Sequence, residues 1–192
     1  MAIKTREKLI DVARQLFARN GVSNTTINDI AAASSKGRRT FYTYFKNKLE
    51  IYNAVLESES ERLVASLREI TITSEPIEDR LRQYLRFRLE HNSIQAETQY
   101  KSWFKLDRRR FDKVTQLVSE KENELLSALL EKGCQQGVFR PERCELLMGF
   151  INQSISMAMI PQATEAEREA REKIFNNLIE FVVSDVCVEK KD

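Results

Sequence analysis

The sequence predicts an all-α chain of about nine helices, with a small three-helix head and a larger helical bundle behind it. Only five glycines and three prolines occur in 192 residues, so the chain offers few breaks. Apolar residues recur at helical spacing along most of its length, and no alternating run of Val, Ile and Thr is long enough for a sheet. We place the boundary between the two domains at residue 48, giving domains 1–48 and 49–192.

The head is predicted to contain one long helix and two short ones. The first spans residues 5–19 and ends at Asn20-Gly21. Thr26 and Asp29 have the spacing of a capping box, which opens a short second helix. Residues 34–37 form a turn, and a third helix covers 38–45. The first helix has one apolar stripe, made of Leu9, Val12, Ala13, Leu16 and Phe17.

The bundle is predicted from the remaining apolar periodicity. Asn47 caps a helix over about 48–69, residues 71–76 connect it to the next, and Pro76 suits a first helical turn. The further helices are expected at about 76–92, 95–106, 112–136, 141–160 and 165–188.

The charge of the chain is unevenly distributed. The formal net charge is only +2. Residues 1–48 nevertheless hold ten basic and three acidic side chains, whereas the remaining 144 residues have an excess of acidic groups. A basic head on an acidic body indicates a polyanionic partner for the head.

Several protein classes are excluded. No run of about 18 apolar residues could span a bilayer, and the N-terminus lacks an apolar signal region, so we expect no membrane association and a cytoplasmic location. Three scattered cysteines and one histidine favour reduced thiols over a zinc site, so we expect no metal and no cofactor. Hydrolase, phosphate-loop and zinc-protease motifs are absent, so we expect no enzyme.

The two short helices and their turn have the layout of a helix-turn-helix unit, which lays its second helix in the DNA major groove. On that helix, Phe41 and Phe45 point to the core. Arginine forks can pair with guanine, and Tyr and Thr hydroxyls suit phosphate oxygens. The side chains left for solvent or DNA are Arg38, Arg39, Thr40, Tyr42, Thr43 and Tyr44. Tyr42 and Tyr44 have a second reading as core residues.

The segments TTINDIA (25–31), TFYTYF (40–45) and KNK (46–48) resemble the TetR family of transcriptional regulators. The similarity covers residues 5–52, and the later helices agree with that family's variable ligand-binding and dimerisation domain. The resemblance implies a backbone contact at Thr26, base contacts at Arg38, Arg39, Thr40 and Thr43, and phosphate contacts at Tyr42, Tyr44 and Lys48. Ser35 stands where the family usually has Gly, so we expect the positive-φ residue of the turn at Gly37.

The last two helices are the predicted dimer surface. The resemblance implies a two-fold four-helix interface that sets two recognition helices about 34 Å apart on a palindromic site. A helix central to its own bundle is the alternative reading. The candidate interface residues are Leu147, Ile151, Ser154, Ile155, Ala158, Ile174, Leu178 and Val182.

An effector pocket is predicted among the aromatic residues of the middle helices, because ligand pockets are mostly apolar with a few polar anchors. An ordinary core explains the same residues. The candidates are Tyr84, Phe87, His91, Tyr100, Trp103, Phe104, Met148 and Gln153.

These features predict a homodimeric regulator, a repressor that binds a double-stranded palindromic operator and is released by a small-molecule effector. The alternative is a DNA-binding dimer of the same fold without an effector, whose bundle serves protein partners or chromosome organisation.

Overall fold

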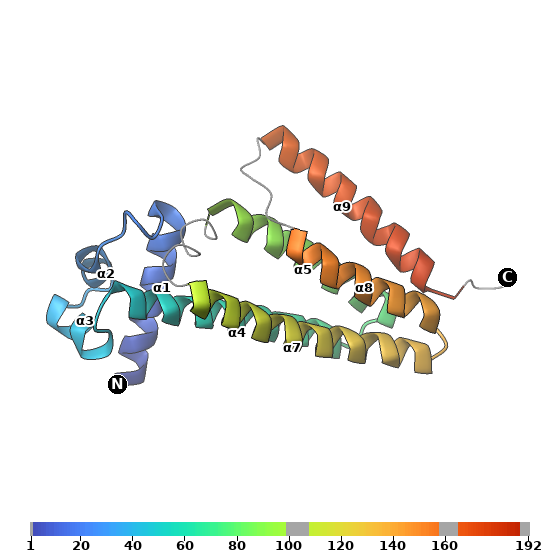
Figure 1. The fold of residues 1–192 in the computed structure, drawn as a ribbon, viewed down its shortest axis with the longest axis horizontal. Coiled ribbons are helices and arrows are strands. Elements are labelled where there is room, and N and C mark those ends of the chain that lie inside the picture. The colour runs from blue at the N-terminus through green and yellow to red at the C-terminus, as the bar shows by residue number, and fades with distance from the viewer. Residues whose placement is uncertain (1, 99–107, 158–164, 189–192) are drawn as a thin grey trace. The chain divides into compact units, whose positions relative to one another are not determined.

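The computed structural model describes residues 2–98, 108–157 and 165–188, and its elements are helices (Figure 1). This confirms the all-α prediction. In the described residues the extended backbone pairs in one place, an antiparallel bridge between Phe139 and Cys187. The helices are α1 (Ala2–Asn20), α2 (Ile27–Ala33), α3 (Arg38–Tyr44), α4 (Lys48–Ile72), α5 (Ile77–Thr98), α7 (Arg108–Gln135), α8 (Pro141–Met157) and α9 (Glu165–Val186).

Several predicted helix boundaries are wrong, since α1 begins at Ala2 and not at residue 5, and α7 begins at Arg108 and not near residue 112. Helix α5 continues to Thr98, so residues 95–98 complete it and do not open a new helix. No Gly or Pro interrupts this segment, so the backbone ladder can continue. The rest of the helix predicted at 95–106 lies outside the described residues. Helix α4 continues to Ile72, so the connection between α4 and α5 is shorter than predicted. Pro76 directly precedes α5, and its carbonyl accepts hydrogen bonds from the Asp79 and Arg80 amides at 3.0 and 3.1 Å.

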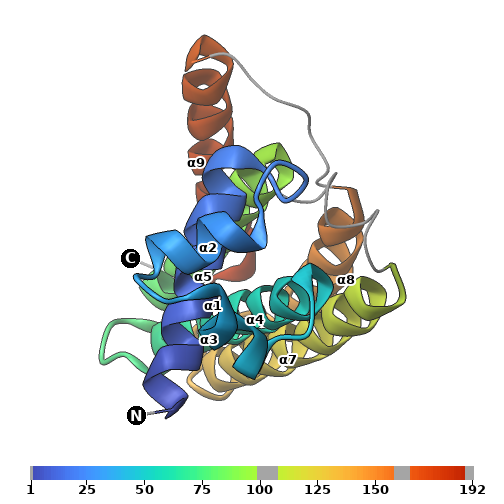
Figure 2. The same ribbon diagram turned by 90° about the vertical axis from the view of Figure 1, so that its left-hand side faces the viewer.

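The chain divides into two compact units, Met1–Leu63 with Thr98–Val118 and Val64–Glu97 with Ser119–Asp192. The first unit therefore contains the head together with the beginning of α4. Figures 1 and 2 show α1, α2 and α3 gathered together within it.

The core of the first unit joins the three head helices to the beginning of α4. The rings of Phe17 and Tyr52 have centroids 6.5 Å apart, and those of Phe41 and Phe45 are 5.7 Å apart. Tyr52 and Phe41 are fully buried. Because α4 completes this core, the head is anchored on a 25-residue helix and the short helices α2 and α3 need little stability of their own.

The second unit has a mixed apolar and ionic interior. Leucines of α7 and apolar residues of α9 are buried there, as is Phe139 of the α7–α8 loop. The Tyr84 hydroxyl donates to the backbone carbonyl of Glu122 at 3.1 Å, and Arg88 Nε lies 2.8 Å from Glu122 Oε1. The fold thus places a buried ion pair between α5 and α7.

The C-terminal end of α9 is attached to the loop between α7 and α8. The Arg140 amide donates to the Val186 carbonyl at 2.9 Å, and the Val188 amide donates to the Val138 carbonyl at 2.8 Å. The Arg140 guanidinium also donates to the Asp185 carbonyl. Backbone bonds therefore hold α9 at the same loop that connects α7 to α8 (Figure 1).

Candidate nucleic-acid interface

Helix α2 begins with the predicted capping box. The Asp29 amide donates to Thr26 Oγ1 at 3.2 Å, and Asp29 Oδ2 accepts from the Thr26 amide at 2.8 Å and from its hydroxyl at 2.7 Å. The backbone amide of Thr26 is the main reason that the pKa of Asp29 lies below its ordinary value, and the hydroxyl adds to it. Both arms of the box fix where α2 starts and leave Thr26 exposed at its entrance.

The turn between α2 and α3 places its positive φ at Ser35, with φ of 56°. The expectation that Gly37 would take this role is wrong, since Gly37 has φ of −71° and is the residue that precedes α3. The path of the chain requires the left-handed residue earlier. The Ser34 amide donates to Ile30 and the Lys36 amide to Ala31, so the bend falls between them.

Helix α3 separates its residues by face as predicted. Phe41 and Phe45 are buried in the head core. Thr40 and Tyr44 are half-buried, and Tyr44 packs against that core, which leaves it with less free surface than its neighbours. The exposed side chains are Arg38, Arg39, Tyr42 and Thr43.

The side chains on the exposed face of α3 are partly organised before any ligand binds. Arg38 Nη2 donates to the Tyr42 hydroxyl at 3.3 Å, and its guanidinium carbon lies 5.6 Å from the centre of the Tyr42 ring. Thr43 Oγ1 donates to the Arg39 carbonyl at 3.2 Å. Within the described part of the chain, neither Arg38 nor Arg39 forms an ion pair, and both side chains are exposed to solvent.

Lys48 stands at the first position of α4 and faces back to the head. Its Nζ donates to the Ser23 carbonyl at 3.2 Å. Desolvation lowers the pKa of Lys48, and the charge of Asp29 opposes that change. Asn47 caps the same helix, since the Glu50 amide donates to Asn47 Oδ1 at 3.0 Å. Lys48 therefore connects the beginnings of α2 and α4 and brings a positive charge to that junction.

The predicted effector residues do not all come together. Tyr84 is buried with its hydroxyl already bonded, and Phe87 is half-buried. The side chains of His91 and Gln153, and the whole of Tyr100, Trp103 and Phe104, lie outside what the structure describes. Met148 instead lines a cavity of about 480 Å³ between α7 and α8, whose lining includes neither Tyr84 nor Phe87.

The predicted dimer residues also divide into groups. Leu147 and Ile151 are buried within the single chain, Leu178 and Val182 are half-buried, and Ile174 is 63% exposed. The side chains of Ser154 and Ile155, and Ala158 as a whole, lie outside the described set. Two further large apolar side chains of the same helices are exposed, Leu146 at 64% and Phe181 at 69%.

The described residues lack two other kinds of site. No group of three or more His, Cys, Asp or Glu side chains among them could hold a metal ion. No described helix is both long enough and apolar enough to cross a bilayer.

Comparison with known proteins supports the helix-turn-helix assignment. Residues 9–55 match the family model for bacterial regulatory proteins of the tetR family. The chain is 36% identical over 94 residues to the probable acrEF/envCD operon repressor of Escherichia coli K12, an alignment that covers 49% of this chain and 36% of that protein. The chain thus spans little more than a third of that relative's length.

More distant similarities extend over most of the chain. It is 22% identical over 171 residues to the uncharacterized HTH-type transcriptional regulator YhgD of Bacillus subtilis, covering 83% of this chain and 84% of that protein. A transcriptional regulator from Cytophaga hutchinsonii superposes with a TM-score of 0.78 at 20% identity, over 95% of this chain and 98% of the other. A TetR-family regulator from Mesorhizobium loti, described as putative in its own name, gives 0.68 at 15%, over 98% and 99%.

The fold and the family motif therefore agree. The all-helical body has the architecture of these solved regulators, and the head matches in sequence as well as in shape. Residues 9–55 of this chain are therefore similar to the DNA-binding domain of the tetR family of bacterial regulatory proteins.

Proposed function

We propose that the protein is a homodimeric transcriptional repressor that binds a palindromic DNA operator and is released from it by a small molecule. The observation that carries the proposal is the exposed face of α3, where Arg38 and Arg39 point outward from a helix held firmly by Phe41 and Phe45. Similarity to the probable acrEF/envCD operon repressor favours repression over activation.

On the proposed interface, α3 enters the major groove and its arginines read base edges. A bidentate arginine–guanine pair is worth about 1–3 kcal/mol of discrimination between bases. Thr40 and Thr43 lie along the same helix for contacts with base edges, while Tyr42 and Lys48 contact the phosphates. Tyr44 is the weaker phosphate candidate because it packs against the core. Thr26, exposed at the entrance of α2, contributes a backbone contact.

The proposed dimer surface lies on α8 and α9. Leu146, Ile174 and Phe181 are each more than three-fifths exposed in the single chain, and large apolar side chains gain free energy when they leave water. We propose that a second copy of the chain covers this surface, because the dimer would then have two DNA-binding heads. Leu178 and Val182, half-buried, border this surface.

Release by an effector is proposed for a dimer that can hold its two DNA-binding heads at two different distances. Only one of these distances fits adjacent major grooves. A ligand that binds more tightly to the dimer whose heads do not fit adjacent major grooves lowers the affinity for DNA. The size of this effect is set by the difference between the ligand's affinities for the two forms of the dimer. The alternative is a dimer without an effector, whose bundle binds other proteins or helps to organise the chromosome.

The decisive experiment is a titration of the protein into duplexes from the DNA that flanks its own gene, at about 150 mM salt with excess random competitor. The expected result is saturable binding that survives competitor, with two protomers per site. Binding that competitor abolishes on every flanking duplex would contradict sequence-specific recognition.

Variants of Arg39 test whether this side chain recognises a base. Arg39→Ala is expected to weaken specific binding by roughly 5- to 150-fold, since a lost bidentate pair costs about 1–3 kcal/mol. Arg39→Lys keeps the charge and loses the fork, so it is expected to preserve binding to random DNA and lose most of the preference for the operator. Equal losses on both DNAs would make Arg39 a phosphate contact.

A further inference from the structure

Two cysteines that the sequence gives no reason to pair lie in contact in the second unit. Cys134 is in the last turn of α7 and Cys144 is in the first turns of α8, and their sulfur atoms are 3.6 Å apart. Both thiols are free. The loop between the helices brings them together, since Gly137 takes a φ of +69° and the amides of Val138 and Phe139 return to the Gly133 carbonyl.

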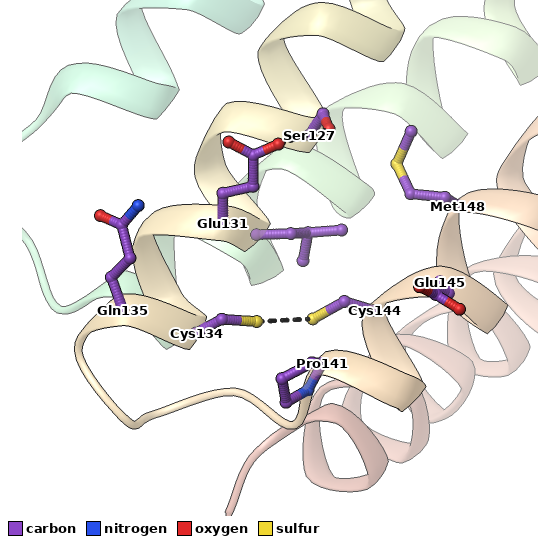
Figure 3. Close-up of a pocket in the computed structure, with 9 residues that line it drawn as sticks. Ser127, Glu131, Cys134, Gln135, Pro141, Cys144, Glu145 and Met148 are labelled. Carbon is purple, nitrogen blue, oxygen red and sulfur yellow. Dashed lines mark hydrogen bonds between the residues drawn. The ribbon is translucent and has the colours of Figure 1, made fainter.

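The thiol pair borders the cavity of about 480 Å³ between α7 and α8 (Figure 3). Figure 3 shows the two sulfur atoms facing each other from the two helices. Leu130, Pro141 and Met148 give the cavity an apolar part. Cys134 and Cys144 belong to the lining, so a small solute that enters the cavity comes next to the thiol pair.

The two thiols differ in their surroundings. Cys134 is half-buried, whereas Cys144 is only 7% exposed. Burial, followed by the neighbouring Cys134, raises the pKa of Cys144 to about 12. Cys144 is therefore a neutral thiol at physiological pH, and Cys134 is the sulfur that a reagent in solution reaches first.

We propose that Cys134 and Cys144 form a reversible dithiol–disulfide site that small hydroperoxides oxidise. The inference concerns thiol chemistry in the second unit and stands independently of the proposed DNA binding. The proposal rests on the contact between two sulfur atoms of different helices beside an open cavity. Two isolated reduced thiols would show no such contact.

The reaction balances in two steps. The Cys134 sulfur attacks one peroxide oxygen, the O–O bond breaks, and the departing hydroxide takes the thiol proton, leaving a sulfenic acid and water. The Cys144 sulfur then attacks the Cys134 sulfur, the S–O bond breaks, and the hydroxyl leaves as water with the Cys144 proton. Two thiols lose two electrons and two protons, and hydrogen peroxide becomes two molecules of water, or an organic hydroperoxide one alcohol and one water.

The geometry asks for a small movement. A disulfide has sulfur atoms about 2.05 Å apart, so the pair must close from the observed 3.6 Å. Rotation of the two side chains about their Cα–Cβ bonds is the movement proposed to bring the sulfur atoms together. Because the second step occurs between groups already in contact, it is favoured over reaction with another molecule.

The test treats the purified, reduced chain with hydrogen peroxide and counts thiols before and after. The untreated protein has three thiols, and treatment is expected to leave one, with a mass loss of about 2 Da that dithiothreitol reverses. The three cysteines fall in three different tryptic peptides, because Lys132, Arg143 and Lys173 are cleavage sites between or before them. Peptide mapping therefore identifies the bridge directly.

Matched serine variants complete the experiment. Cys187→Ser is expected to form the bridge like the parent chain, whereas Cys134→Ser and Cys144→Ser are expected to form none. The bridge in the parent chain is also expected to raise the melting temperature by roughly 5 °C, since a short loop is closed. A bridge to Cys187, a bridge between two chains, or three surviving thiols would each overturn the proposal.

Discussion

The Nζ of Lys48 donates to the backbone carbonyl of Ser23 at 3.2 Å, across a separation of 25 residues. This contact joins the beginning of α4 to the loop that precedes α2. Asp29, the acidic partner in the cap of α2, also acts electrostatically on Lys48. A single side chain thus connects the beginning of α4 to the loop before α2, and its charge lies beside the proposed DNA surface.

Replacement of Lys48 by Ala is expected to lower DNA affinity on every duplex and to flatten the dependence of log K on log salt by about one unit, because one phosphate contact is lost. Fluorescence anisotropy at several salt concentrations measures this slope. Lys121→Ala is the matched control, an exposed lysine of α7 in the second unit, and should leave the slope unchanged. An unaltered slope for Lys48→Ala would restrict that side chain to its contact with Ser23.

Asp29 predicts a component of acid sensitivity in the head. Its pKa is below the ordinary value of 3.8, chiefly because the Thr26 amide donates to the ionised carboxylate. A lowered folded-state pKa gives stability that is fully present above the unfolded value and is lost as the pH falls through the folded value. Asp29→Asn should therefore reduce the slope of stability against pH below about pH 4, measured by urea unfolding. Glu61→Gln, at an exposed position of α4, is the control and should leave that slope in place.

Replacement by alanine is expected to change stability in opposite directions at Gly133 and Gly149. A Cβ at Gly133 would overlap the ring of the buried Phe139, whereas a Cβ at Gly149 meets nothing within 4 Å. Gly133→Ala is expected to destabilise the second unit by about 1–3 kcal/mol, because the ring must move in a packed core. Gly149→Ala should stabilise α8 by up to about 1 kcal/mol. Thermal unfolding of the two variants compares them, and equal melting temperatures would contradict the contact with Phe139.

The buried pair of Arg88 and Glu122 is expected to behave as a unit. Arg88→Met leaves a carboxylate that is only 2% exposed without its cation, at a cost of about 3–5 kcal/mol. The double variant Arg88→Met with Glu122→Leu removes both charges and should recover most of that loss. Denaturant unfolding of the single and double variants forms a thermodynamic cycle. Additive losses would show that the two charges do not interact.

The pair of Arg88 and Glu122 also predicts how the stability of the fold changes with pH. Burial raises the pKa of Glu122 and the Arg88 charge opposes this, with the raised direction prevailing. The folded state then holds a proton that the unfolded state releases, so this carboxyl favours folding at low pH and costs stability as the pH rises above its ordinary value of 4.5.

The head was predictable from sequence because its signals are local. The capping box needs only Thr26 and Asp29 at their spacing, and both of its arms are present in the structure. Phe41 and Phe45 are four residues apart, so helical geometry alone sends them to one side, and both are buried. Local preference failed at Ser35, where the route of the backbone between α2 and α3 sets a positive φ that serine seldom takes.

Contacts between distant segments could not be read in this way. Periodicity predicted α5 and α7 without showing that Arg88 on one meets Glu122 on the other. A weak signal existed, since Arg88 lies one turn beyond Tyr84 on the inward face of α5. Similarly, Cys134 and Cys144 stand in separate helices, and their meeting depends on the conformation of the loop between them. Side-chain spacing describes one helix at a time, whereas these pairs depend on how two helices approach.

The backbone bonds between α9 and the α7–α8 loop lie at the C-terminal end of that helix. Its bonds to the loop at Val138 and Arg140 are made by Val186 and Val188, after almost the whole helix has passed. Because α9 has 22 residues and is about 33 Å long, Glu165 lies a full helix length away from this attachment. A truncation before Val186 would remove these backbone bonds and leave α9 held by its side chains, among them the buried Ile179 and Val183, whereas a truncation after Val188 would leave the bonds intact.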